Sequence, residues 1–236
     1  MSAVAIIPAR GGSQRIPRKN LKSFNGAPMI VWSIRAALDS GVFERIVVST
    51  DDPEIAEVAL AHGADVPFIR PAELSDHHTG TSPVIRHAVQ ALAEQGMTFD
   101  FACCLYATAP LLRPRYLRQG LQAIEGALDK SFAFSVCTFA FPVQRALVLE
   151  PSGGVEPMYP EFSAVRSQDL PQAYQDAGQF YWGRSAAWLR GDPVFSPLGV
   201  PIILPRHLVQ DIDTEEDWLR AEYMYAALLA SGELHG

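Results

Sequence analysis

The chain has 236 residues, of which 48% are hydrophobic and 19% are charged, and its formal net charge is −7. Such a chain can fold as one α/β domain with a sizeable core, and its composition excludes intrinsic disorder. The acidic balance argues against general nucleic-acid binding. No apolar run reaches the roughly 18 residues of a membrane helix and no signal peptide is recognisable, so we expect a soluble cytoplasmic protein without a membrane partner.

The basic side chains are concentrated at the start of the chain. The first 38 residues contain no acidic residue, and their basic residues are Arg10, Arg15, Arg18, Lys19, Lys22 and Arg35. A basic cluster in an acidic protein favours a small, highly charged anion as ligand, and a basic surface without a ligand is the simpler alternative.

Apolar runs alternate with helical patterns along the first part of the chain. In chain order we expect strand 4–7, helix 28–38, strand 46–48, helix 53–62, strand 66–69, helix 81–95, strand 101–105, helix 115–128 and strand 132–138. This alternation predicts a single domain over residues 1–236, with a mostly parallel sheet and helices on both faces.

Prolines and glycines interrupt the pattern over residues 139–175. An unstructured loop of this length is unusual inside a compact domain, so we expect an excursion with its own hairpins and a candidate dimerisation arm. Regular signals then return as the strand "GQFYW", a helix near 184–189, the extended segment "VPIILP" and a last helix at about 214–229.

Ligands of open parallel sheets bind beyond the carboxyl ends of the strands. Polar loops are expected there at Arg10–Asn20, Ser49–Asp52, Tyr106–Arg113 and Asp211–Asp213. The first loop combines groups that suit phosphates, namely Arg10, Gly11, Gly12, Ser13 and Lys19. Its spacing fits neither the P-loop nor the dinucleotide-binding fingerprint. Asn20 offers a donor and an acceptor, which suits the edge of a base.

Carboxylates follow two of these predicted elements. Asp51 is a candidate for ligand contact, whereas Asp52 is more suited to capping the next helix. Asp211 and Asp213 are two residues apart, which places both carboxylates on one side of an extended chain. Such a pair suits Mg²⁺, which takes one or two carboxylates together with substrate phosphates. Capping of the last helix by Asp213 or Thr214 is an alternative that is compatible with metal binding.

Four segments together are more specific than any one of them. They are "IPARGGSQRIPRKNL" near the start, "VSTDDPEIAEVA" after the second strand, "RPAELS" at 70–75 and "DIDTEEDW" at 211–218. Their sequence and order resemble the acylneuraminate (sialic acid) cytidylyltransferase family over almost the whole chain. Within that family, "DAGQFYW" at 176–182, "PIILPRHLVQDIDTEEDW" at 201–218 and the "TAP" of "YATAPLL" are most similar to members that act on pseudaminic acid.

The resemblance implies a Rossmann-like nucleotidyltransferase fold with an excursion that helps to form a homodimer. It also implies a reaction in which CTP and a nine-carbon acidic sugar, a nonulosonic acid, give a CMP-sugar and pyrophosphate with Mg²⁺. N-acetylneuraminic, legionaminic and 3-deoxy-manno-octulosonic acids remain alternative sugars. A sugar nucleotidyltransferase that uses another nucleoside triphosphate, and a nucleotide-binding protein without catalysis, remain alternative functions.

Residue chemistry and matched positions together predict three sets of site residues. The catalytic set is Arg10, Lys19, Asp211 and Asp213, of which the two aspartates match metal-associated positions. The CTP-binding set is Arg10, Gly11, Gly12, Ser13, Lys19, Asn20, Arg70 and Asp51, in which Arg70 matches a cytosine-contacting arginine. The sugar-binding set is Tyr106, Thr108, Asp176, Gln179 and Tyr181.

The chain departs from the family pattern at two positions. Tyr106 stands where many sialic acid enzymes have glutamine, which favours a different sugar. Gln14 stands where the family usually has lysine, and the neighbouring Arg15 could replace the missing cation. The sugar carboxylate needs a cation or amide donors, for which Gln179 and Arg166 are candidates, the second across a dimer interface.

Overall fold

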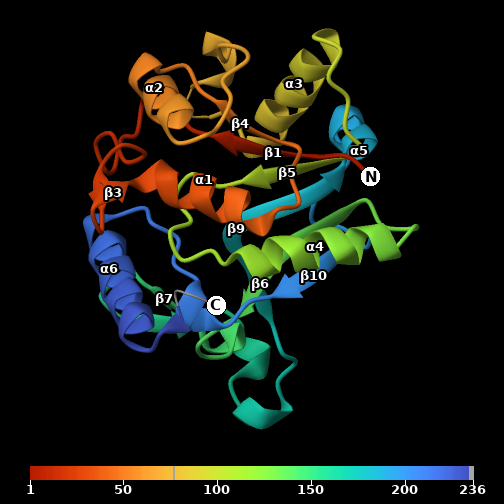
Figure 1. Cartoon of the computed structure of the whole chain (residues 1–236). Helices are drawn as coiled ribbons and strands as arrows, with labels where there is room; N and C mark the ends of the chain where they lie inside the picture. The colour runs from red at the N-terminus through yellow and green to blue at the C-terminus, as the bar shows by residue number, and fades with distance from the viewer. Residues whose placement is uncertain (77, 234–236) are drawn as a thin grey trace.

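The computed structural model describes residues 1–76 and 78–233 (Figure 1). Its central sheet has six strands in the order β10 (Gly199–Ile203), β6 (Phe132–Thr138), β9 (Tyr174–Arg184), β5 (Phe101–Leu105), β1 (Ala3–Pro8) and β4 (Arg45–Ser49). Only β9 runs antiparallel, between β5 and β6, and the other pairings in this sheet are parallel. The predicted α/β class with a mostly parallel sheet is confirmed.

Helices cover both faces of the sheet, as the alternating pattern predicts (Figure 1). One face packs against α1 (Met29–Ser40), α2 (Pro53–Ala61), α4 (Pro114–Gly126) and the later part of α6 (Glu215–Ala230). The other face packs against α3 (Thr81–Glu94) and α5 (Ser185–Arg190). β1 and β5 are therefore almost wholly buried, which explains why they are continuous apolar runs rather than alternating ones.

A smaller apolar cluster fastens the first loop to the last helix. The short hairpin of β2 (Ser23–Phe24) and β3 (Ala27–Pro28) places Phe24 against Ile16, Ile212 and Trp218, all of which are buried. Residues far apart in the chain therefore meet at this cluster. It holds the basic loop next to the acidic segment that precedes α6.

Side-chain caps fix the starts of two helices. Asp52 accepts hydrogen bonds from the backbone N–H groups of Glu54 and Ile55, so its predicted capping role is confirmed. Thr214, rather than Asp213, caps α6, and it forms a capping box with Asp217. This leaves the Asp213 carboxylate available for other contacts.

The expected strand at 66–69 is wrong. This part of the chain forms a single bridge, between Asp65 and Val47, and no strand follows it. Pro67 has no N–H to donate to a ladder, so pairing ends there. The chain then turns and brings Arg70 into the interior.

Residues 139–173 leave the central sheet and contain a short hairpin, whereas Tyr174 and Gln175 already belong to β9. The role of this segment as a dimerisation excursion stays a prediction. β7 (Leu147–Leu149) and β8 (Val155–Pro157) pair antiparallel, and three 3₁₀ turns accompany them at Val143–Arg145, Pro160–Phe162 and Ser167–Asp169. In Figure 1 this segment extends at the bottom of the view, away from α2 and α3. Phe141 and Leu149 are 81% and 80% exposed.

Within the residues that the structure describes, no helix is both long and apolar enough to cross a membrane.

Candidate active site

A cleft of about 580 Å³ opens beyond the carboxyl ends of β1 and β5. In the sheet, β1 lies between β4 and β5. The strand order therefore reverses at β1, and open α/β sheets bind their ligands at such a switch point. Four cations line the cleft: Arg10, Arg15, Lys19 and Arg70. The site therefore suits a multiply charged anion.

Two predicted ligand residues hold the first loop in place. The backbone N–H of Gly11 donates to Asp51 Oδ1 at 3.1 Å, and Asn20 Nδ2 donates to the Arg10 carbonyl at 3.0 Å. A Cβ on Gly11 would lie 2.5 Å from Asp52 Oδ2, so this close approach requires glycine. Asn20 lines the cleft, whereas Asp51 lines an adjoining open hollow that also contains Arg70.

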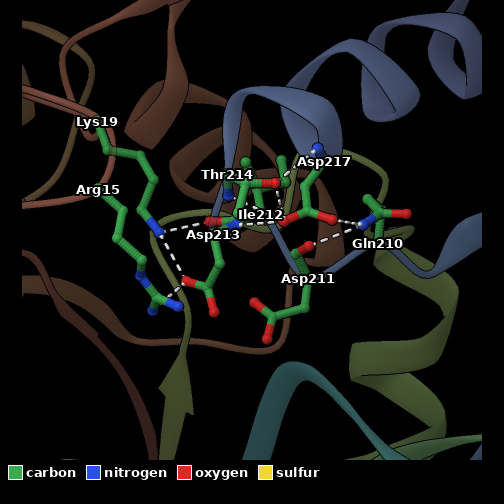
Figure 2. A network of polar contacts seen from close by, with 8 residues as sticks. All are labelled: Arg15, Lys19, Gln210, Asp211, Ile212, Asp213, Thr214 and Asp217. Carbon is green, nitrogen blue, oxygen red and sulfur yellow. Dashed lines mark hydrogen bonds and ion pairs between the residues drawn. The ribbon is translucent and has the colours of Figure 1, made fainter. Parts of the chain in front are cut away.

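The cations of the first loop already have partners from distant segments. Arg10 Nη1 donates to the carbonyl of Asp76, and Lys19 Nζ donates to the carbonyl of Ile212. Arg15 pairs with Asp213 across 2.7 Å, as Figure 2 shows. Ser13 also lines the cleft, whereas the exposed Gly12 is not among its lining residues.

Arg70 is a buried cation in the cleft wall. It is 5% exposed, and its Nη2 donates to the Ser49 carbonyl at 2.6 Å. Burial lowers the pKa of its guanidinium, and the nearby Asp51 carboxylate partly opposes that change. Its Nε has no hydrogen-bond partner within the described parts of the chain. A desolvated cation with an unused donor is well suited to bind a polar group that enters the cleft.

Asp211 and Asp213 lie side by side before α6 (Figure 2). Burial raises the pKa of the Asp211 carboxyl, and the neighbouring Asp213 carboxylate adds to the rise. A divalent cation would relieve this repulsion, and two carboxylate oxygens suit Mg²⁺. The pair therefore fits the ion. No cluster of three or more His, Cys, Asp or Glu ligands occurs among the described residues. Mg²⁺ generally takes one or two carboxylates together with water and substrate phosphates.

The predicted sugar-binding residues fall into two groups. Tyr106 and Thr108 line the cleft, whereas Asp176, Gln179 and Tyr181 do not. Gln179 is 3% exposed and donates to the Leu208 carbonyl, and the Tyr181 hydroxyl donates to Asp176. The register of β6 against β9 shifts between Phe134, which pairs with Tyr181, and Val136, which pairs with Asp176. Tyr181 is buried against the Tyr106 ring and Gln179 is buried near Leu208, whereas Asp176 is exposed outside the cleft lining. Their contact with the sugar stays a prediction.

The sequence interpretation missed Asp76 and the run from Thr79 to Thr81, which also line the cleft. Asp76 accepts from the N–H of Thr79 at 2.7 Å, and the Thr81 hydroxyl lies 3.3 Å from the Tyr106 hydroxyl. The segment ends at the first turn of α3, where backbone N–H groups favour an anion. A polar run, "TGTS", directly before a helical pattern is the signal that could have revealed it.

A mostly parallel sheet with a basic cleft at its switch point, lined also by Asp213, is typical of nucleotide-binding α/β enzymes. A family model described as "Cytidylyltransferase" matches residues 4–147. The chain belongs to the cytidylyltransferase family and is therefore a nucleotidyltransferase, as the sequence predicts.

Named relatives cover nearly the whole chain. Pseudaminic acid cytidylyltransferase of Campylobacter jejuni (serotype O:23/36, strain 81-176) is 46% identical over 95% of this chain and 97% of its own. The CMP-N,N'-diacetyllegionaminic acid synthase of Legionella pneumophila is 32% identical over 94% of this chain and 95% of its own.

Among solved structures, a CMP:2-keto-3-deoxy-manno-octonic acid synthetase complexed with CTP has the same fold. It superposes with a TM-score of 0.70 at 19% identity, over 96% of this chain and 99% of its own. This likeness confirms the predicted nucleotidyltransferase fold.

Proposed function

We propose that the enzyme transfers CMP from CTP to the anomeric hydroxyl of pseudaminic acid, giving CMP-pseudaminic acid and pyrophosphate. The observation that carries this proposal is the convergence of Arg10, Arg15, Lys19 and Arg70 on one cleft that also contains Asp213. The 46% identity to a pseudaminic acid cytidylyltransferase over most of both chains supports the choice of sugar.

In the proposed reaction the sugar hydroxyl attacks the α-phosphorus of CTP in line with the departing pyrophosphate. Such transfers depend on positioning and charge neutralisation more than on covalent catalysis. Arg10 and Lys19 stabilise the charge that develops on the pyrophosphate, and Ser13 donates a hydrogen bond to the phosphates. The glycines of the first loop allow the backbone to approach them closely.

Asp211 and Asp213 would hold the Mg²⁺ that the family resemblance implies. The bound ion would neutralise phosphate charge and make the α-phosphorus more electrophilic. Lys19, which contacts Asp213 and also lines the cleft, links this acidic pair to the phosphate-binding side of the site.

Selection of cytosine is assigned to Arg70 and Asn20. Asn20 also holds the first loop in place, because its side chain donates to the Arg10 carbonyl. Both residues are buried in the cleft wall, where a wrongly matched base edge would leave polar groups unpaired. The sugar is assigned to the Tyr106 and Thr108 side of the cleft, with Thr81 beside them.

The excursion is proposed to form a homodimer through its exposed apolar residues, and Arg166 on it is a candidate for contact with the partner's sugar. The cytoplasmic location stays a prediction.

The decisive experiment measures pyrophosphate release with Mg²⁺, with CTP and each other nucleoside triphosphate, and with pseudaminic, N-acetylneuraminic, legionaminic and 3-deoxy-manno-octulosonic acids. We expect CTP and pseudaminic acid to give the highest kcat/KM. Preference for another sugar would overturn the substrate assignment and keep the chemistry, whereas preference for another nucleotide would overturn the roles of Arg70 and Asn20.

A further inference from the structure

Two cations share one carboxylate oxygen at the edge of the cleft. Arg15 Nη2 lies 2.7 Å from Asp213 Oδ1, and Lys19 Nζ lies 3.4 Å from the same oxygen. Figure 2 shows both cations approaching Asp213 from one side, with the Asp211 side chain next to it. The Asp213 carboxylate thus pairs with two cations. If one of them moves away, the other still neutralises the carboxylate.

Lys19 has more contacts and is less exposed than Arg15. The Lys19 side chain is 19% exposed, and it also donates to the carbonyl of the fully buried Ile212. The Arg15 side chain is 67% exposed, and within the described residues Asp213 is its only ion-pair or hydrogen-bond partner. An exposed pair with a long, mobile side chain contributes little stability, so Arg15 is the cation that can move at small cost.

The same Asp213 oxygens would bind the divalent ion that the site fits. A divalent cation on Asp213 and a guanidinium on the same carboxylate repel each other at contact distance. Arg15 already lines the cleft with Arg10 and Lys19, so release from Asp213 leaves its planar donor fork among the phosphate-binding groups.

We propose that Arg15 is a further triphosphate-binding residue, which Asp213 holds in an ion pair until a divalent cation displaces it. This inference rests on the proposed function. The exchange couples the two ligands: the metal frees Arg15 for CTP, and CTP removes a competitor of the metal. Such coupling is reciprocal, so each ligand raises the affinity of the other by the same factor.

The test uses the full-length protein and isothermal titration calorimetry without sugar, so that CTP is not consumed. Mn²⁺ replaces Mg²⁺ as the probe. It is titrated alone, and CTP is titrated with and without Mn²⁺, into wild type, Arg15→Met and Arg45→Met. Arg45 is a matched control, because it forms an exposed 2.8 Å pair with Asp65 and is not among the residues that line the cleft.

Arg15→Met is expected to bind Mn²⁺ alone about threefold more tightly, because its competitor is gone. It is expected to bind CTP in the presence of Mn²⁺ about tenfold more weakly, because a charged phosphate contact is lost. Arg15→Lys should retain part of the CTP affinity, and Arg45→Met should match wild type. Melting temperatures of all variants confirm that each is folded.

Three results would overturn the inference. If Arg15→Met binds both ligands as wild type does, the pair is an ordinary surface contact. If it binds CTP more weakly but Mn²⁺ no more tightly, Arg15 touches phosphate without competing with the metal. If wild type binds neither CTP nor Mn²⁺, the proposed function fails as well, which distinguishes that outcome from the other two.

Discussion

The hydroxyl of Tyr181 donates a 2.5 Å hydrogen bond to the carboxylate of Asp176. Tyr181 is 5% exposed, and its ring lies 5.3 Å from that of Tyr106, which faces the cleft. Burial raises the pKa of Tyr181, and Tyr106 and Asp176 raise it further, so this phenol stays protonated and acts as a donor. We infer that Asp176 and Tyr181 position Tyr106, and the predicted contact of Asp176 with the sugar stays a prediction.

Tyr181→Phe should therefore lower kcat/KM for the sugar about tenfold, the effect of losing one hydrogen bond to a charged group, while the Kd of CTP stays unchanged. Steady-state kinetics with the sugar varied, and CTP titration without sugar, measure the two quantities. Tyr223→Phe is the control, because Tyr223 is 67% exposed on α6. A variant with unaltered sugar kinetics would show that the position of Tyr106 does not depend on this contact.

Replacing Asp211 or Asp213 should lower the reaction rate without lowering the stability of the fold. Asp211→Asn and Asp213→Asn are each expected to lose about 10²–10³ in rate at limiting Mg²⁺. Asp211→Asn also removes the repulsion that raises the pKa of Asp211, so its melting temperature should stay equal or rise slightly. Asp65→Asn, at an exposed pair elsewhere, is the control. Near-normal rates in both folded variants would refute the metal assignment.

Arg70→Ala tests the recognition of the base. The loss of a buried guanidinium that lines the cleft is expected to weaken CTP binding by about ten- to a hundredfold and to reduce the preference for CTP over UTP. Calorimetric titration with both nucleotides gives the two affinities, and Arg45→Ala serves as the control. Unchanged CTP affinity in a folded variant would show that Arg70 has only a structural role, through its bond to the Ser49 carbonyl.

Two glycines of α4 offer a matched test of packing. A Cβ at Gly120 would lie 2.5 Å from the Trp182 ring, which is fixed by a hydrogen bond to the Leu117 carbonyl and by stacking on Phe43. Gly120→Ala should cost about 1–3 kcal/mol of unfolding free energy through overpacking. Gly126, where nothing lies within 4 Å, should tolerate alanine without loss. Chemical denaturation measures both, and equal stabilities would contradict this account of the helix–sheet contact.

The excursion should govern assembly. Leu149 and Phe141 are exposed in the single chain. Leu149→Asp, alone or combined with Phe141→Asp, is expected to prevent the proposed dimer, because a charge placed in an apolar contact is strongly unfavourable. Analytical ultracentrifugation reports the mass, and Leu60→Asp, at an exposed leucine of α2, should not change it. A wild-type protein that sediments as a monomer would remove the proposed role of the excursion.

Local sequence patterns determined most of the secondary structure. The strands at Phe101–Leu105 and Phe132–Thr138 have the predicted bounds, because continuous apolar runs of that length suit strands covered on both faces. Asp52 was predictable as a cap because capping depends on residues within three positions. The basic first loop was likewise visible, because its residues are consecutive.

Only the tertiary structure decided which of these groups meet. The contact of Arg10 with Asp76 spans 66 positions, and that of Lys19 with Ile212 spans 193. Local propensity carries no information about such pairs, which follow from how the sheet and helices pack. For the same reason the sequence grouped Asp176 and Tyr181 with Tyr106 as sugar ligands, whereas only the fold shows that Tyr106 lines the cleft, that Tyr181 is buried against it and that Asp176 accepts the Tyr181 hydroxyl.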